Sequence, residues 1–190
     1  MKVIKTIFND VFVIKSERHN DERGFFSESF VSKNFIELVK KNIVFCQDNF
    51  SYSKKNVIRG LHYQLPPYSQ SKLVSVLKGK VLDVVVDIRK GSPTFGHHFS
   101  FELSSENLIQ LFIPKGFAHG YITLSESSIF HYKVDQYYYP KNEISINPSD
   151  PDLHIDWKIP KGEWILSKKD KQNSLFSEAK VFNYKEDLYG

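Results

Sequence analysis

The sequence predicts an all-β barrel or sandwich, and three observations lead to this prediction. Short apolar stretches follow one another about every ten residues and are separated by turn signals, as in consecutive strands. Sixteen Phe and ten Tyr bring the aromatic content to 15%, which favours packed β structure. No linker or repeat interrupts the 190 residues, so we expect a single domain over residues 1–190, long enough to bury a sizeable core.

The first element with a clear periodicity is a helix expected over Ser32–Lys41. Phe35 and Val39 fall on one of its faces, as expected for a helix that packs on a sheet. Ser32 or Asn34 is placed to cap its start, because a short polar side chain can accept a hydrogen bond from a free backbone N–H.

From Lys72 onward the pattern is that of strands. Lys72–Leu77 and Val81–Arg89 are apolar runs joined by a hairpin-like turn at Lys78–Lys80. The second run places Leu82, Val84, Val86 and Ile88 on one face and Asp83, Val85 and Asp87 on the other. Further strands are expected at His98–Glu102, Leu108–Ile113, Gly120–Leu124 and Ile129–Tyr137. Beyond Asp170 the chain either frays or forms a weak helix packed on the barrel.

Composition excludes several classes of protein. Cys46 is the only cysteine, which excludes an intrachain disulfide and a cysteine-based zinc site. The net charge of +4 comes from scattered Lys and Arg, so no basic stripe for nucleic acid is visible. The Met1–Lys5 segment lacks the apolar core of a signal peptide, and no stretch approaches the roughly 20 apolar residues of a membrane span. We therefore expect a cytoplasmic protein that does not contact membranes.

Two segments carry the candidate chemistry. Arg59–Gln64 and Pro114–Gly120 each join a glycine-marked bend to a short β-type run, and each supplies one imidazole, His62 and His119. A third segment, Tyr132–Tyr138, adds tyrosines on an expected strand. Imidazole and phenol groups can exchange protons with a carbon acid without a cofactor.

Through these ordered motifs the chain resembles the dTDP-4-dehydrorhamnose 3,5-epimerase family from about residue 12 to residue 170. The resemblance implies a cupin-type jelly-roll β-barrel with a few short peripheral helices. It also implies cofactor-free 3,5-epimerisation of dTDP-4-dehydro-6-deoxy-D-glucose to dTDP-4-dehydro-L-rhamnose, a precursor of cell-surface polysaccharide. The implied partner is the nucleotide sugar, and neither a cofactor nor a metal is expected.

The resemblance assigns catalytic roles to four residues, and places His119 among the substrate-binding residues, where it holds the sugar or the enolate. His62 is the expected base that removes protons alpha to the C4 ketone, and Asp170 is the carboxylate that orients it. Tyr132 returns the proton from the opposite face of the sugar. Lys72 stabilises the enolate at O4, with His119 as a second contributor. Taken singly, each residue also fits a structural role: a histidine bonded to the backbone, a half-buried strand tyrosine or a strand-edge lysine.

Further residues match substrate-binding positions of the family. Arg23 and Arg59 provide guanidinium forks for the diphosphate. Tyr138 stacks on the thymine, and it shares strand parity with Tyr132, so both face one cleft if no bulge intervenes. The remaining matches are Glu28, Gln47, Asn49, Glu143 and Lys169. In this family the Arg23–Glu28 arm often crosses to the partner subunit, which implies a homodimer.

One stretch departs from the family pattern. An Arg-Gly-Ile-Arg-Trp-type run usually follows the glutamate, and here Ile144–Pro148 stands instead, so the sugar preference is less defined than the chemistry. A mono-epimerase or a 3,4-ketoisomerase on a related nucleotide 4-keto sugar is therefore an alternative. Retention of the motifs around both His62 and Tyr132 favours epimerisation.

Two other classes are disfavoured. Pro114–His119 matches the second metal motif of metal-dependent cupins, but the first motif requires His-x-His, and His62 is followed by Tyr63 and Gln64. A non-catalytic sugar-binding barrel would keep the substrate-binding arginines. It would have no reason to keep the proposed base, lysine and tyrosine together.

Overall fold

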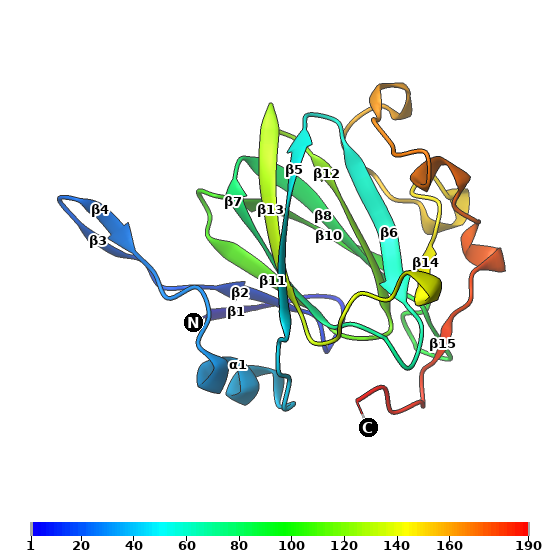
Figure 1. The fold of residues 1–190 in the computed structure, drawn as a ribbon, viewed down its shortest axis with the longest axis horizontal. Helices are drawn as coiled ribbons and strands as arrows, with labels where there is room; N and C mark the ends of the chain where they lie inside the picture. Colours follow the sequence, from blue (N-terminus) through cyan, green and yellow to red (C-terminus); the bar gives the residue numbers. More distant parts are fainter. Residues whose placement is uncertain (1, 190) are drawn as a thin grey trace.

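The computed structural model describes residues 2–189 and is built mainly of strands, which confirms the all-β prediction. Two antiparallel sheets face each other (Figure 1). The six-stranded sheet has the order β1 (Lys2–Lys5), β2 (Phe12–Lys15), β11 (Ile109–Ile113), β7 (Lys72–Lys78), β13 (Ser127–Val134) and β5 (Gln47–Lys54). The five-stranded sheet has the order β10 (His98–Ser104), β8 (Lys80–Asp87), β12 (Phe117–Thr123), β6 (Ile58–Gln64) and β14 (Glu143–Ser145).

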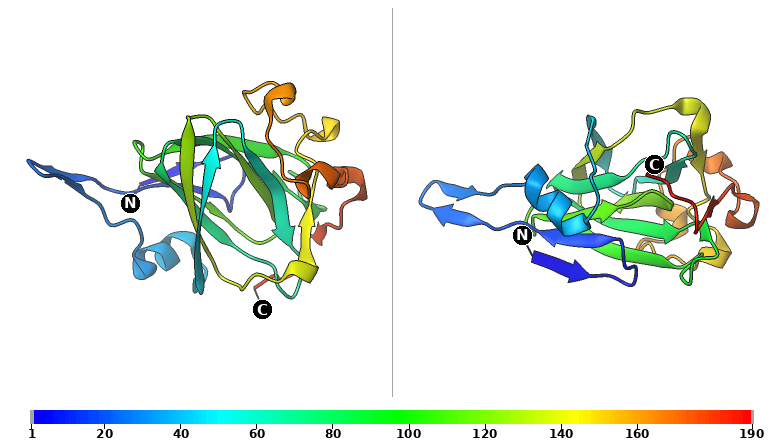
Figure 2. Two further views of the ribbon diagram at one scale, coloured as in Figure 1. Left: turned by 45° about the horizontal axis from the view of Figure 1, so that its top comes forward. Right: turned by 90° about the horizontal axis from the view of Figure 1, so that it is seen from below.

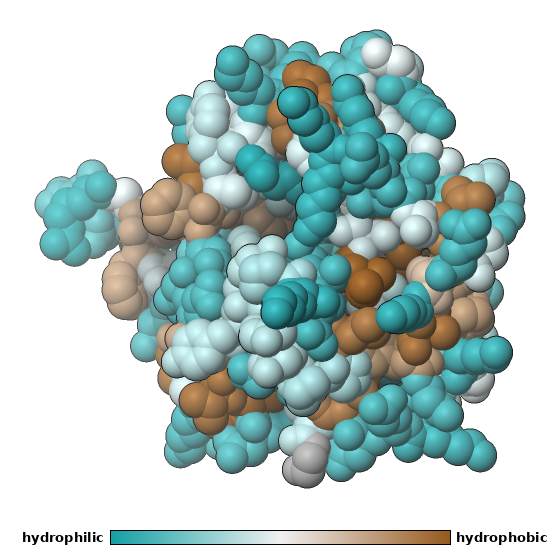
Figure 3. All heavy atoms as spheres, turned by 45° about the vertical axis from the view of Figure 1, so that its right-hand side comes forward, coloured by the Kyte–Doolittle hydropathy of each residue, from teal (hydrophilic) through white to brown (hydrophobic). Residues whose placement is uncertain are grey.

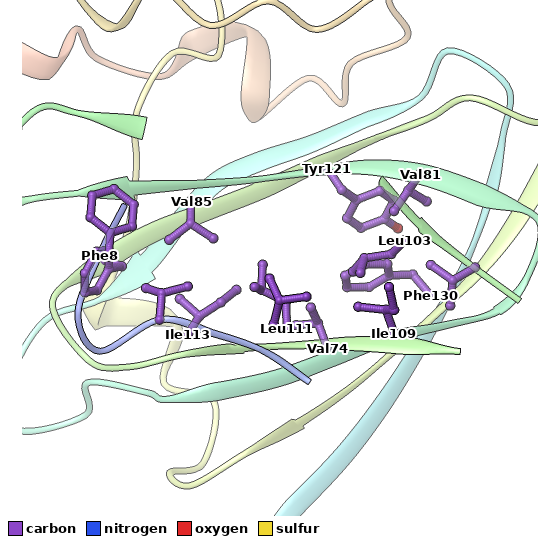
Figure 4. Packing of buried hydrophobic residues seen from close by; sticks show 14 residues of the cluster. Phe8, Val74, Val81, Val85, Leu103, Ile109, Leu111, Ile113, Tyr121 and Phe130 are labelled. Carbon is purple, nitrogen blue, oxygen red and sulfur yellow. The ribbon is translucent and has the colours of Figure 1, made fainter. Parts of the chain in front are cut away.

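The main core lies between the two sheets (Figure 4). Val74, Leu111 and Phe130 come from the six-stranded sheet and meet Val85 and Tyr121 of the five-stranded sheet. Alternation along each strand sends the intervening residues to the opposite face. The central strands are buried on both faces because additional segments cover the outside of each sheet.

The outer face of the six-stranded sheet is covered by α1 (Ser32–Val39). Phe35 and Val39 of this helix pack on Leu73 and Phe112, in agreement with the predicted apolar face. The predicted caps are wrong, because Val31 occupies the N-cap position and no side chain caps the helix. Packing of the apolar face, rather than a polar cap, therefore accounts for the position of this helix.

The outer face of the five-stranded sheet is covered by the chain that follows β14. Trp157, Leu153 and Phe182 pack there against Val84 and Val86, so the two predicted faces of the Val81–Arg89 run are confirmed. This segment contains 3₁₀ turns and one short strand; from Asp170 onward, where fraying or a weak helix was expected, two of the turns and the strand are formed. The turns and the strand are η2 (Pro151–Leu153), η3 (Lys161–Glu163), η4 (Asp170–Gln172), η5 (Phe176–Glu178) and β15 (Phe182–Asn183), which pairs with β9 (Arg89–Lys90).

A two-stranded arm projects from the body of the molecule. It consists of β3 (His19–Asp21) and β4 (Gly24–Phe26), and the views in Figures 1 and 2 both show it extending away from the two sheets. Phe25 and Phe26 are 48% and 67% exposed on it. Figure 3 shows that the side carrying the C-terminal segment is mostly hydrophilic, with separate hydrophobic side chains between the polar ones. None of the helices described over residues 2–189 is long and apolar enough to cross a membrane.

Candidate active site

A cavity of about 320 Å³ is lined by residues of both sheets, including β5 at the edge of one sheet and β6 and β14 of the other. Both sheets and the segment before η4 contribute side chains to it. The lining residues are Ser51, Arg59, His62, Lys72, His119, Tyr121, Phe130, Tyr132, Glu143, Ser167, Lys169 and Asp170. Eight of the thirteen residues predicted from the sequence are therefore in this lining.

An irregularity in the pairing of β6 with β12 places two of these residues on the same face. His62 pairs with His119 and Arg59 with Tyr121, so the two residues between them on β6 oppose a single residue on β12. Strict alternation would put Arg59 and His62 on opposite faces, and the bulge removes that conflict. Gly60 makes the bulge possible: its φ is +142°, and a Cβ there would lie 2.5 Å from the Cα of Gly120.

His62 forms a hydrogen-bonded pair with Asp170. The His62 Nε2 lies 2.7 Å from Asp170 Oδ1, and the Ser167 hydroxyl donates to Asp170 Oδ2 at 2.8 Å. Burial by itself raises the pKa of Asp170, but the bonds from His62 and Ser167 hold that pKa below its ordinary value. An ionised Asp170 accepts the Nε2 proton, which leaves Nδ1 of the imidazole free to accept another.

His119 forms a second pair of the same kind with Asp83, deeper in the barrel. The His119 Nε2 lies 2.8 Å from Asp83 Oδ2, and both side chains are buried. Burial lowers the pKa of His119, and the charge of Asp83 only partly opposes that shift. Asp83 Oδ1 has no hydrogen-bond partner among the described residues.

Lys72 and Tyr132 reach the cavity from the six-stranded sheet. Burial lowers the pKa of Lys72 to about 8, although Glu143 and Asp83 raise it, so the ammonium form is readily deprotonated in mildly basic solution. Burial raises the pKa of Tyr132, and neighbouring Tyr121 and Glu143 add to this shift. At neutral pH the phenol of Tyr132 is therefore a proton donor.

The Arg59 guanidinium is oriented by hydrogen bonds to β5. Its Nε donates to the Ser53 hydroxyl at 3.0 Å, and one Nη donates to the Tyr52 carbonyl at 3.2 Å. The Tyr121 hydroxyl bonds to Ser53 and to Ser51, at 3.1 and 2.8 Å. These bonds hold a cation at the rim of the cavity, where an anionic ligand could meet it.

A second cavity of about 300 Å³ adjoins the first and shares Tyr132 and Glu143 with it. Glu143 accepts a hydrogen bond from the Tyr138 hydroxyl at 2.9 Å and pairs with Lys169. Burial alone raises the pKa of Glu143, but the contacts with Lys169 and Tyr138 lower it overall. The other residues lining this cavity are Gln47, Asn49 and Gln70.

The predicted strand Ile129–Tyr137 is too long, which changes the argument for Tyr138. β13 ends at Val134, so strand parity between Tyr132 and Tyr138 does not apply. Tyr138 nevertheless lines the second cavity, because the loop after the strand returns toward β6 and the backbone N–H of Tyr139 donates to Gln64 at 2.6 Å. Tyr132 and Tyr138 therefore line one cavity, as predicted, but strand parity is not the reason.

Arg23 and Glu28 do not line either cavity of this chain. Arg23 lies on the arm with 86% of its side chain exposed, paired with Asp21 at 2.6 Å, and Glu28 is exposed just beyond β4. Sequence reasoning also left out several lining residues. Ser51, Tyr121, Phe130 and Ser167 carried no separate signal. Asp83 does not line the cavity but pairs with His119; it was placed on the correct strand face and not assigned to the site.

Across residues 2–189 no cluster of three or more His, Cys, Asp or Glu side chains is arranged to hold a metal ion. The cavity contains instead two His–Asp pairs, a lysine, a tyrosine and an arginine. Such a set can remove a proton from a carbon acid, stabilise the resulting oxyanion and supply a proton.

Comparison with known proteins identifies the family. The model for dTDP-4-dehydrorhamnose 3,5-epimerases matches residues 5–178. The chain belongs to this family. It is 48% identical over 182 residues to dTDP-4-dehydrorhamnose 3,5-epimerase of Shigella flexneri, covering 96% of this chain and 99% of that protein.

A solved structure of this family has the same fold. The dTDP-6-deoxy-D-glucose-3,5-epimerase of Legionella pneumophila, in complex with dTDP-4-keto-L-rhamnose, superimposes with a TM-score of 0.93 at 46% identity, over 97% of this chain and 99% of that one. The cupin-type jelly-roll expected from the resemblance is thereby confirmed. A more distant relative, the dTDP-4-dehydrorhamnose 3-epimerase of Streptomyces niveus, is 34% identical and covers 90% of this chain and 81% of that protein.

Proposed function

We propose that the protein catalyses the cofactor-free 3,5-epimerisation of dTDP-4-dehydro-6-deoxy-D-glucose to dTDP-4-dehydro-L-rhamnose. The observation that carries this proposal is the placement of a base and an acid on opposite walls of one cavity. His62 with Asp170 lies on the wall formed by the five-stranded sheet, and Tyr132 lies on that formed by the six-stranded sheet. A sugar ring between these walls meets proton acceptor and proton donor on different faces, which inversion of a stereocentre requires.

The reaction divides into two proton transfers at each carbon. His62 Nδ1 takes the proton from the carbon next to the ketone, the C–H electrons form the enolate, and negative charge moves to O4. The Lys72 ammonium stabilises that oxygen, and neutral His119, whose Nε2–H is used by Asp83, holds the sugar by accepting a hydrogen bond at Nδ1. Tyr132 then donates its proton to the carbon from the other wall. Solvent takes the proton from His62 and returns one to Tyr132 before the second carbon reacts and before the next turnover.

The nucleotide part of the substrate is assigned to the second cavity and the rim. Arg59 meets the diphosphate, and Tyr138 stacks on the base. Gln47, Asn49, Glu143 and Lys169 supply further polar contacts in these two cavities.

We further propose a homodimer in which the arm completes the cleft of the partner subunit. The support is the exposure of Phe25 and Phe26 on the arm, and the position of Arg23 and Glu28 outside this chain's own cavities. Light scattering should give twice the 22.2 kDa chain mass. Deleting residues 19–28 should give monomers that lose most activity, and a monomeric full-length chain with full activity would contradict this arrangement.

The test of the function is proton exchange at the sugar. Purified protein is incubated with dTDP-4-keto-6-deoxyglucose in D₂O, and deuterium at C3 and C5 is followed by NMR. We expect deuterium at both carbons, with EDTA without effect. Deuterium at one carbon alone would favour the mono-epimerase alternative. A relative that is 34% identical to this chain is named as a 3-epimerase, so this alternative has a precedent among similar proteins. No exchange at either carbon would contradict the proposal.

Tyr132→Phe separates the two proton transfers in the same experiment. Because His62 still removes protons while the opposite donor is absent, deuterium should enter from the base side with the original configuration, and inverted product should fall by about 10²-fold or more. Product of the inverted configuration formed at the wild-type rate would assign the acid to another residue.

A further inference from the structure

Gln64 uses every polar atom of its side chain to join two loops at the rim of the second cavity. Its side chain is buried, and its residue is 3% exposed. The amide Nε2 donates to the carbonyl of Tyr68 at 2.7 Å and to that of Tyr137 at 3.2 Å. The amide Oε1 accepts from the backbone N–H of Tyr139 at 2.6 Å. One side chain therefore binds the loop after β6 to the loop after β13.

Two other contacts join the same loops. The rings of Tyr68 and Tyr139 stack with centroids 4.0 Å apart and planes within 13°. The Gln70 amide donates to the carbonyl of Gln136 at 2.7 Å. All of these hydrogen bonds are partly buried, but Gln64 is a buried residue and Gln70 is not, and removing the Gln64 amide leaves three backbone groups without that partner.

Tyr138 lies between the two residues that Gln64 holds. The backbone groups of Tyr137 and Tyr139 both bond to the amide, so the direction of the intervening side chain depends on it. The Tyr138 hydroxyl then reaches Glu143, which is the residue opposite Gln64 in the β14–β6 pairing. The second cavity thus takes its shape from a buried amide that does not line it.

The pattern of two donors and one acceptor is specific to a glutamine at this position. Glutamate keeps the acceptor for the Tyr139 N–H but loses both donors when ionised, and methionine has the same length without any of these groups. We propose that Gln64 is a positioning residue that fixes Tyr138 and thereby sets the affinity of the second cavity for the nucleoside part of the substrate. This inference rests on the function proposed above.

The experiment compares Gln64→Met and Gln64→Glu with the wild-type enzyme. We expect KM to rise about 10-fold in Gln64→Met with kcat changed less than about 2-fold, because the His62 side of the cleft is unaltered. Calorimetry should show the same loss of affinity for dTDP, with unchanged affinity for inorganic pyrophosphate, which lacks the nucleoside.

Gln64→Glu tests the hydrogen bonds within one variant, because protonating its carboxyl restores one of the lost donors. Its KM relative to wild type at the same pH should be highest when the carboxylate is ionised. It should fall as the pH drops, because a protonated carboxyl again donates to one of the two carbonyls. Thr123→Val is the matched control, since it removes a buried hydroxyl pair with Ser128 elsewhere in the barrel. This control should lower the Tm and leave KM unchanged.

Wild-type KM and dTDP affinity in Gln64→Met would overturn the inference. A fall in kcat at unchanged KM in Gln64→Met, or an equal loss of its affinity for pyrophosphate, would also overturn it. The same holds if the KM of Gln64→Glu relative to wild type does not vary with pH. Failure of the proposed function gives a different result, because the wild-type enzyme itself would then neither exchange protons with the sugar nor bind dTDP.

Discussion

The cavity contains two His–Asp pairs of nearly identical geometry in different surroundings. His62 and Asp170 are 2.7 Å apart, with 26% and 6% of their side chains exposed, and His119 and Asp83 are 2.8 Å apart, with 7% and 0% exposed. The first pair joins β6 to the segment at η4 and has a second donor, Ser167. The second pair joins two central strands and leaves one carboxylate oxygen without a partner among the described residues.

This difference in exposure shows that a hydrogen bond to an aspartate does not by itself make a histidine a catalytic base. The imidazole of His62 has access to the cavity and solvent, so it can gain and lose a proton during turnover. The imidazole of His119 is held neutral by burial, which lowers its pKa, and it is suited to donate or accept a fixed hydrogen bond. We therefore expect the His62–Asp170 pair to act mainly in catalysis and the His119–Asp83 pair to contribute mainly to stability.

Replacing the exposed histidine should have the largest effect on rate. His62→Ala should lower kcat by about 10⁴-fold, the upper end for a positioned acid–base group, because it removes the more exposed of the two imidazoles on that wall, the one assigned to take the proton. Binding of dTDP should survive, and the Tm should change little, since Asp170 keeps its bond from Ser167. Steady-state kinetics and calorimetry check both; near-full turnover would contradict the assigned mechanism.

Replacing the carboxylate of the same pair should have the second largest effect on rate. Asp170→Asn should lower kcat by about 10²-fold, because an amide nitrogen next to Nε2 favours the tautomer that carries its proton on Nδ1. ¹⁵N NMR of the His62 ring should show that change of tautomer. A variant with wild-type kcat would mean that Asp170 is a structural partner only.

The buried pair should show the reverse balance between rate and stability. His119→Ala should lower kcat by only about 10-fold, but it leaves Asp83 buried without a partner and should cost about 3 kcal/mol in unfolding free energy. Denaturant unfolding of this variant beside His62→Ala tests the comparison directly. Equal losses of stability in the two variants would show that burial does not distinguish the pairs.

The smallest effect concerns pH. Because burial lowers the pKa of Lys72 to about 8, kcat should fall several-fold as the pH rises from 7 to 9 and the ammonium is lost. Between pH 8 and the ordinary lysine pKa the unfolded chain binds more protons than the folded one at this group, so its contribution to stability rises with pH. Lys72→Met should lose the activity step near pH 8; a wild-type profile in that variant would assign the step to another group.

Much of this arrangement could be predicted from the sequence. Alternation in the Val81–Arg89 run correctly placed Asp83 opposite the outward face, and the two glycine-marked motifs supplied both cavity histidines. The pairing of Asp83 with His119 could not be predicted, because it requires the order of β8 and β12 in the sheet. Arg59 and His62 share a face only because of the bulge, which periodicity does not indicate.

Loop geometry accounts for the remaining differences. Tyr138 was assigned to the cleft by parity along a strand that ends four residues earlier, and hydrogen bonds from Gln64 rather than alternation bring its loop to the cavity. Arg23 and Glu28 lie outside the cavities of this chain, so no feature of an isolated subunit can place them in a site.

The contact between Gly60 and Gly120 also limits which substitutions this chain can accumulate. A Cβ at either position would lie within 3.0 Å of backbone atoms of the facing strand, and backbone cannot rotate away as a side chain can. In a saturation mutagenesis scan these two codons should therefore tolerate almost no replacement, in contrast to Gly162, where an added Cβ would meet nothing within 4 Å. The strand register that places the base therefore depends on two positions at which no side chain fits.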